Sequence, residues 1–314
     1  MKNKDNLMTS NPWVTYNNGN YRVFLNTETG TKIRTNNLDS LIPTHPESMD
    51  VKITNSCNMM CKQCHEASTP NGKHGDILNA KFLETLLPYT ELAIGGGNPL
   101  AHPDLEEFLY KCKDLKLIPS MTVHQKHFLE NVELLKHYKN EGLIYGLGVS
   151  VVSVTEELIK TLKEFPTAVC HIIAGIADEN IITKLAHNDL KVLILGYKQF
   201  RRGKDLYEIE EDNIRFLIQF LYDALPEIIK DEWFNTVCFD NLAIKQLNVK
   251  RLMSEEEWQE FYMGDDGTHT FYIDLVNQRY ALSSTAEETF PLEDDVTTMF
   301  QHIRKIHDSM EAPI

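Results

Sequence analysis

The chain has 314 residues and carries 46 acidic against 31 basic side chains, which gives a formal charge of −15. This surplus of negative charge disfavours nucleic acid as a general partner, because nucleic acids are bound mainly through basic groups that displace counterions. No apolar run approaches the roughly 18 residues that cross a bilayer, and residues 1–11 lack the apolar segment of a secretion signal, so we expect a cytoplasmic protein with no membrane contact.

The first predicted region, residues 1–48, is a β-meander followed by a polar linker. Short strand-like runs at 13–16 and 21–26 alternate with turn signals. Pro43 and Pro46 interrupt the polar segment that follows.

In the second region, residues 49–232, strands and helices alternate six times. The predicted strands are 50–54, 91–94, 118–123, 144–152, 169–173 and 192–195. The predicted helices are 78–87, one starting near 103, 128–138, one capped by Ser153 and Glu156, 180–187 and 212–230. Consecutive βα units with short connections predict a parallel sheet wound in one sense, either a partial barrel or an open sheet.

In the third region, residues 233–314, the alternation ends, and we predict a C-terminal α+β extension. A strand is expected at 237–239 and a hairpin from 270–276 to 280–283. Ser254 and Glu257 predict the cap of a short helix, and Val296, Phe300 and Ile303 mark a terminal helix.

The strongest local signal is a group of three cysteines, Cys57, Cys61 and Cys64, directly after the first predicted parallel strand. Three thiolates on one loop can bind three irons of a [4Fe–4S] cluster and leave the fourth iron open. A structural zinc is the alternative, but it needs a fourth ligand, and His65 is adjacent to Cys64. The other cysteines are isolated, so we predict a single cluster; they are Cys112, Cys170 and Cys238.

With this CxxxCxxC loop after the first strand of six βα units, the chain resembles the radical S-adenosylmethionine superfamily over residues 49–230. The resemblance implies a (βα)6 partial parallel barrel, one [4Fe–4S] cluster on the three cysteines, and S-adenosylmethionine bound at the open iron. It further implies that one electron cleaves S-adenosylmethionine to methionine and a 5′-deoxyadenosyl radical, which abstracts hydrogen from a substrate. An external one-electron reductant, flavodoxin- or ferredoxin-like, is the implied partner.

Other elements of the superfamily match this chain residue by residue. Its GGEP element, which contacts the methionine amino group, is matched with Asn98 in place of the glutamate; the matching residues are Gly95, Gly96, Gly97, Asn98 and Pro99. Ser150 matches a polar residue that contacts the ribose or the carboxylate. Residues 171–178 resemble the GxIxGxxE element, which implies that Ile173 packs on adenine.

Sites in parallel α/β folds lie at the carboxyl ends of the strands. This rule nominates, among others, His171, which we take as a candidate catalytic residue. Asp240 is expected to cap a helix and is a second catalytic candidate. The rule also nominates a basic segment that can bind a phosphate or a carboxylate, with the side chains Lys198, Arg201, Arg202 and Lys204.

The leading functional hypothesis is a radical S-adenosylmethionine enzyme that modifies a peptide or protein side chain. The N-terminal meander and the C-terminal hairpin offer strand edges on which an extended peptide can pair. An alternative substrate is a nucleotide or another phosphorylated small molecule held by the basic segment. A non-catalytic iron–sulfur electron carrier or sensor is the alternative of another class, and it predicts a cluster without cleavage of S-adenosylmethionine.

Overall fold

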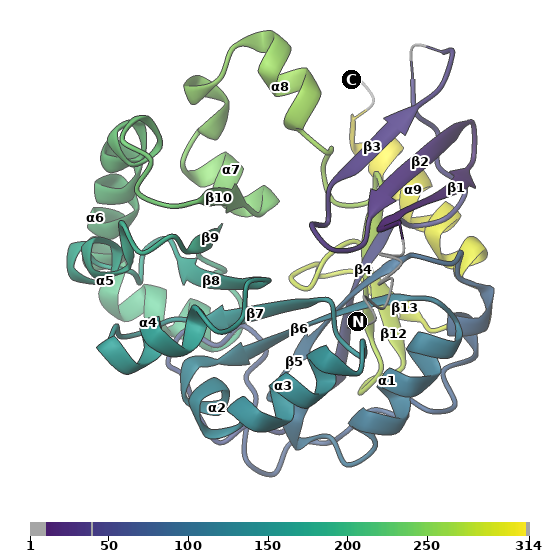
Figure 1. Ribbon diagram of the computed structural model, residues 1–314, viewed down its shortest axis with the longest axis horizontal. Coiled ribbons are helices and arrows are strands. Elements are labelled where there is room, and N and C mark those ends of the chain that lie inside the picture. Colours follow the sequence, from purple (N-terminus) through teal and green to yellow (C-terminus); the bar gives the residue numbers. More distant parts are fainter. Residues whose placement is uncertain (1–10, 39, 312–314) are drawn as a thin grey trace, which may run out of the picture.

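The computed structural model describes residues 11–38 and 40–311, arranged as in Figure 1. The main sheet has ten strands in the order β10-β9-β8-β7-β6-β5-β4-β11-β12-β13. All neighbours from β10 to β11 pair in parallel. These strands are β4 (Ser48–Thr54), β5 (Glu91–Gly96), β6 (Ile118–His124), β7 (Gly146–Ser150), β8 (Ala168–Ile173), β9 (Lys191–Leu195), β10 (Thr236–Phe239) and β11 (Thr270–Asp274).

Helices follow the strands and cover the outer face of the curved sheet (Figure 1). This confirms the predicted α/β fold with a partial parallel barrel. The α-helices of this layer are α1 (Leu105–Asp114), α2 (Gln125–Glu130), α3 (Val132–Asn140), α4 (Glu156–Leu162), α5 (Glu179–Leu185) and α6 (Arg202–Lys230), and the short 3-10 helices are η1 (Lys81–Thr85) and η2 (Pro99–Ala101).

Alternation along β4 separates the core of the sheet from its inner face. Met49, Val51 and Ile53 are at most 1% exposed and belong to the hydrophobic core. Asp50 and Lys52 occupy the intervening positions and so point to the opposite, inner face. Parallel strands that are covered on both faces are continuous apolar runs in sequence. The polar residues here show that the inner face of β4 does not belong to the hydrophobic core.

The predicted cap of α4 is wrong. Thr155, not Ser153, is the N-cap residue, and its side chain accepts a hydrogen bond from Leu158 N–H at 3.1 Å. Ser153 is held elsewhere: the Gln125 amide donates to Ser153 Oγ (2.8 Å) and its carbonyl oxygen accepts from Ser153 N–H (3.0 Å). A contact from a preceding βα unit therefore overrides the local capping pattern.

Two predicted helices also differ in extent. The long helix expected from residue 212 begins at Arg202, so the end of the basic segment forms its first turn. The backbone leaves helical geometry at Glu210 (φ −121°, ψ 27°), which hides the earlier part from a periodicity analysis. The helix expected over 128–138 is divided at Asn131 into α2 and α3.

The N-terminal meander is confirmed as a three-stranded antiparallel sheet of β1 (Trp13–Asn18), β2 (Tyr21–Asn26) and β3 (Lys32–Thr35). A buried carboxylate ties it to the start of β4. Glu47, 1% exposed, accepts two hydrogen bonds from the Arg34 guanidinium (2.8 and 2.6 Å) and pairs with Lys32 at 3.2 Å.

The C-terminal residues contribute to both ends of the main sheet. β10 adds a parallel strand beside β9, while β11 pairs with β4 and continues into β12 (Arg279–Ala281) and β13 (Phe290–Pro291). The remaining helices are α7 (Asn241–Gln246), η3 (Val249–Leu252), α8 (Glu255–Phe261) and α9 (Val296–Glu311). The division into 1–48, 49–232 and 233–314 remains our proposal for the domains.

A search for membrane-spanning segments found none: among residues 11–38 and 40–311, no helix combines the length and the apolar character that crossing a bilayer requires. The expected absence of a secretion signal concerns residues that, apart from Asn11, lie outside the described ranges.

Candidate functional site

The three cysteines lie on one loop that leaves the carboxyl end of β4. This cysteine loop, residues 55–69, folds back on itself, because Cys57 N–H donates to the Thr69 carbonyl (2.9 Å) and Thr69 N–H donates to the Asn55 carbonyl (3.1 Å). Met60 and Ala67 have φ angles of 50° and 51°, a left-handed conformation that costs energy for residues other than glycine. The hydrogen bonds of the loop therefore stabilise a backbone conformation that is unfavourable by itself.

The thiols of Cys57, Cys61 and Cys64 are free and half-buried. Burial raises the pKa of Cys57 and Cys61, and the Cys64 thiol raises both further. Within the described residues, no group of three or more His, Cys, Asp or Glu is placed to hold a single metal ion. A cluster makes a different demand, because each thiolate binds its own iron, and three thiols on one loop fit that donor set.

The two arginines of the predicted basic segment bind the cysteine loop. Arg202 donates to the Ser68 carbonyl at 2.9 Å, and its second terminal nitrogen lies 3.6 Å from Met60 Sδ. Arg201 donates to the Glu66 carbonyl at 2.9 Å and lies 3.4 Å from the Glu66 carboxylate. The binding of a substrate anion by this segment stays a prediction.

The first turn of α6 approaches the cysteine loop closely at Gly203. A Cβ at this position would collide with the Lys198 carbonyl oxygen and would lie 3.3 Å from the Gln63 carbonyl oxygen. Lys198 itself donates to Ser284 Oγ at 2.9 Å. Of the four basic side chains, Lys204 is exposed to solvent and makes none of these contacts.

A buried ion network lies beneath the loop. Glu66 forms an ion pair with Lys52 at 2.7 Å, and Lys52 also lies 3.2 Å from Asp274. The Tyr272 hydroxyl donates to Glu66 at 3.2 Å. The network thus joins the cysteine loop to β4 and β11. Burial, followed by nearby cationic groups, holds the pKa of His65 well below its usual range, so this imidazole is neutral beside Glu66.

The loop has a second support on the side of α2. The Nε2 atom of His127 lies 2.7 Å from Asn58 Oδ1, and as the amide oxygen accepts, the imidazole donates. His127 is 3% exposed, and burial lowers its pKa, so this donor is the neutral tautomer with hydrogen on Nε2. Asn58 directly follows Cys57, so α2 fixes the start of the CxxxCxxC sequence.

The glycine run, Gly95 to Asn98, packs directly against the segment that leads to Cys57. Gly97 N–H donates to the Thr54 carbonyl and Asn98 N–H donates to the Ser56 carbonyl, both at 2.7 Å. A Cβ on Gly97 would collide with the Ser56 carbonyl oxygen, whereas nothing lies within 4 Å of a Cβ built on Gly95. The close approach therefore requires glycine at 97, while 95 faces open space.

Gly96, Asn98 and Pro99 also have local reasons for their identities. Gly96 has a φ of 109°, and a Cβ there would lie 2.9 Å from the Lys52 side chain. Asn98 caps η2 by accepting a hydrogen bond from Leu100 N–H at 3.3 Å, and Pro99 follows at the first helical position. The side-chain oxygen of Asn98, the expected substitute for the superfamily glutamate, thus accepts a hydrogen bond from the backbone of η2.

Ser150 and His171 are neighbours on the inner face of the sheet, as β7 and β8 place them in register. The imidazole of His171 occupies the space over Gly148, where a Cβ would collide with the ring and would lie 2.8 Å from Thr122 Oγ1. Burial lowers the pKa of His171 to about 4. This side chain is therefore neutral at physiological pH. Ile173, two positions further along β8, packs on a separate small apolar cluster.

Asp240 caps α7, as predicted from its sequence context. Its carboxylate accepts hydrogen bonds from Ala243 N–H (2.7 Å) and from Gly196 N–H (2.9 Å). Asp178, matched to the acid of the GxIxGxxE element, is exposed and caps α5. Both carboxylates thus have structural partners.

Asp50, on β4, is a further titratable residue of the inner face that was not predicted from the sequence. Its side chain reaches solvent on the concave inner face but is surrounded by protein, and this desolvation raises its pKa to about 6, against the effect of Lys198. Asp266, Asp240 and Glu66 raise it further. The signal was present in the alternation of β4, which places residues 50 and 52 opposite the core.

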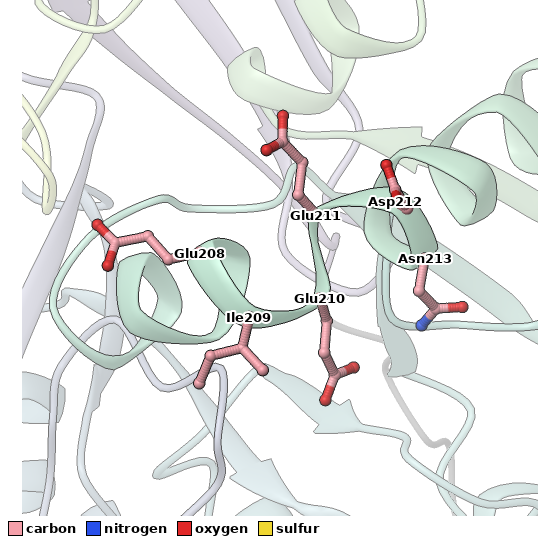
Figure 2. Close-up of a pocket in the computed structure, with 6 residues that line it drawn as sticks. All are labelled: Glu208, Ile209, Glu210, Glu211, Asp212 and Asn213. Carbon is pink, nitrogen blue, oxygen red and sulfur yellow. The ribbon is translucent and has the colours of Figure 1, made fainter.

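The region around the break in α6 is a separate surface feature. Figure 2 shows Glu208, Ile209, Glu210, Glu211, Asp212 and Asn213 pointing in divergent directions from one stretch of helix. None of the cysteine-loop or glycine-run residues lines this pocket. Its carboxylates oppose the binding of an anion.

Comparisons with known proteins show the fold and two partial sequence similarities. No protein-family profile matches the chain. It is 29% identical over 144 residues to the antilisterial bacteriocin subtilosin biosynthesis protein AlbA of Bacillus subtilis, covering 43% of this chain and 31% of AlbA. It is 26% identical over 204 residues to a probable GTP 3′,8-cyclase of Methanocaldococcus jannaschii, covering 62% of this chain and 65% of the relative. The alignments thus span less than two thirds of either relative.

Solved structures of Streptococcus suis SuiB share the fold over most of the chain. SuiB bound to precursor peptide SuiA matches with a TM-score of 0.58 at 15% identity, covering 94% of this chain and 90% of SuiB. SuiB bound to S-adenosylmethionine matches with a TM-score of 0.53 at 15% identity, covering 87% and 82%. These comparisons support the resemblance of the chain to the radical S-adenosylmethionine superfamily.

Proposed function

We propose that this protein is a radical S-adenosylmethionine enzyme that modifies a peptide or protein side chain. Cys57, Cys61 and Cys64 would hold one [4Fe–4S] cluster, which supplies the electron that cleaves S-adenosylmethionine to a 5′-deoxyadenosyl radical, the species that abstracts hydrogen from the substrate. The observation that carries the proposal is the direct packing of the glycine run on the segment leading to Cys57.

The residues around the cysteine loop suit the binding of S-adenosylmethionine. Open space at Gly95 allows a ligand to approach the backbone of the glycine run. Ser150 offers a hydroxyl on the inner face, and Ile173 offers apolar surface at the end of β8. His171, neutral between them, can donate or accept a hydrogen bond without adding charge.

A peptide substrate is supported by the relatives and by the sheet edges. AlbA is a bacteriocin biosynthesis protein, and SuiB has been crystallised with a precursor peptide. In the described part of the chain, β1 and β3 end the small sheet, and β10 and β13 end the main sheet. Edge strands carry unpaired backbone groups on which an extended peptide can add as a further strand.

A phosphorylated small molecule is the second candidate, favoured by the similarity to a probable GTP 3′,8-cyclase. The contacts of Arg201 and Arg202 with the cysteine loop argue against it, because these side chains were its expected anion ligands. Titration with GTP separates the candidates: a rise in 5′-deoxyadenosine formation would contradict the peptide proposal.

An electron carrier is the candidate of another class. It would bind the cluster and leave S-adenosylmethionine intact, so anaerobic reconstitution followed by an assay for 5′-deoxyadenosine distinguishes it from an enzyme.

As the enzyme requires electrons, we propose a flavodoxin- or ferredoxin-like donor as its partner, in the reducing cytoplasm where thiols persist.

A further inference from the structure

Arg202 is a cation that has no anionic partner among residues 11–38 and 40–311. Its guanidinium contacts a backbone carbonyl, of Ser68, and a thioether sulfur, of Met60, both of which are uncharged. Among the described residues, no carboxylate lies within ion-pair distance of it, and its Nε atom is buried without an acceptor. A partly buried charge is costly unless an anion or a set of hydrogen bonds compensates it.

The neighbouring Arg201 shows the ordinary solution to the same problem. Its guanidinium lies 3.4 Å from the Glu66 carboxylate, so its charge is compensated within the chain. Lys204, in the first turn of α6, is exposed, so water solvates its charge. Arg202 has neither arrangement, although it lies between them.

The position of Arg202 indicates that its anionic partner would lie at the cysteine loop. Met60 precedes Cys61, and Ser68 closes the same loop, so the guanidinium spans the cysteine loop from one side. Three thiolates make a bound [4Fe–4S] cluster anionic, and reduction adds a further negative charge. A cation and hydrogen-bond donors beside a cluster favour its reduced state.

We propose that Arg202 is a positioning residue for the cluster, which fixes the cysteine loop through Ser68 and Met60 and stabilises the reduced state by its uncompensated charge. This inference rests on the cluster of the proposed function. It assigns the basic segment a role in electron transfer in place of substrate binding. The role is indirect: Arg202 fixes the cysteine loop, and its positive charge compensates the negative charge of the cluster.

The test uses the full chain with the variants R202M and R202Q, and K204M as a control that removes one positive charge from the same helical turn. Hydrogen exchange is measured on the apo-protein at the hydrogen-bonded amides of Cys57, Cys64 and Thr69. We expect these amides to exchange about tenfold faster in R202M, because a charge-assisted hydrogen bond is lost. K204M should exchange as the wild type does.

The decisive readout is the midpoint potential of the reconstituted cluster, followed by electron paramagnetic resonance. In R202M the ratio of oxidised to reduced cluster at a fixed potential should rise about tenfold, a shift of about 59 mV for one electron. R202Q retains a donor without the charge and should show the same shift, and it replaces R202M if that variant does not fold. R202K should keep the wild-type potential.

An R202M or R202Q potential equal to that of the wild type would overturn the proposal. So would an equal shift in K204M, because the effect would then be one of general charge. The potential is measured on the cluster alone. A wild-type protein that holds the cluster but forms no 5′-deoxyadenosine would therefore end the proposed enzymatic function without deciding this inference, which the potentials decide separately.

Discussion

The Lys52 ammonium and the Glu66 carboxylate lie 2.7 Å apart with only 1% and 6% of their side chains exposed. Lys52 comes from the inner face of β4, and Glu66 comes from the cysteine loop, two positions after Cys64. The ion pair therefore couples the position of the loop to the sheet below it. Since the Lys52 stem also runs beneath Gly96, the same side chain supports the glycine run.

Removing one member of this pair should destabilise the protein strongly. We expect E66Q to lower the free energy of unfolding by about 3–5 kcal/mol, because Lys52 would remain as a buried charge with weaker compensation. Urea unfolding of the apo-protein measures it. K81M is the matched control, as Lys81 pairs with Asp294 at 2.9 Å with side chains 70% and 74% exposed, and it should unfold as the wild type does. Equal stability of E66Q and K81M would contradict the structural role.

Glu47 should make stability depend on pH. Burial alone would raise its pKa, but Arg34 and Lys32 lower it to about 2. Because the folded-state pKa is depressed, the contribution is fully present above the ordinary value of 4.5 and is lost as the pH falls towards 2. The shift corresponds to roughly 3 kcal/mol. Comparing wild type and E47Q between pH 5 and pH 2 tests this, and parallel stability curves would refute it.

The glycine run offers a pair of substitutions with opposite expectations. G97A should lower the free energy of unfolding of the apo-protein by about 1–3 kcal/mol, because its Cβ meets the Ser56 backbone. G95A should leave apo stability unchanged, since nothing lies within 4 Å of that Cβ. Thermal unfolding of both variants is the measurement, and equal effects would show that the packing on Ser56 does not constrain the run.

His171 should remain neutral across the physiological range. Its folded-state pKa of about 4 is below the ordinary 6.5, so the stability that its neutral burial provides is present above pH 6.5 and is lost as the pH falls towards 4. Imidazole resonances assigned with an H171N variant give the pKa directly by NMR. Titration of His171 near pH 6.5 would contradict the burial of its ring over Gly148.

Local sequence patterns predicted the architecture but not the contacts that hold the cysteine loop in place. The alternation of strands and helices indicated the parallel sheet, and the cysteine spacing indicated the loop after β4. The start of α6 was not predicted, because Arg201 has a φ of 50° and provides no side-chain cap. In addition, Gly203 lies in the first turn, and Glu210 breaks the helical periodicity. None of these positions carries a usual helix-start signal.

Contacts between distant segments were beyond the reach of sequence patterns. The pairing of Lys52 with Glu66 and the hydrogen bond from His127 to Asn58 depend on how the βα units pack around the loop. The contacts of the basic segment were missed for the same reason, since its charge is visible in the sequence but its partners on the loop are not. Asp50, in contrast, could have been found from the alternation of β4.

The most direct test of the account is the formation of 5′-deoxyadenosine by the anaerobically reconstituted, dithionite-reduced protein supplied with S-adenosylmethionine. The wild type should bind one [4Fe–4S] cluster and form 5′-deoxyadenosine, while Cys61→Ala should form none. An intact cluster without 5′-deoxyadenosine, or undiminished turnover in Cys61→Ala, would contradict the assignment of this protein as a radical S-adenosylmethionine enzyme.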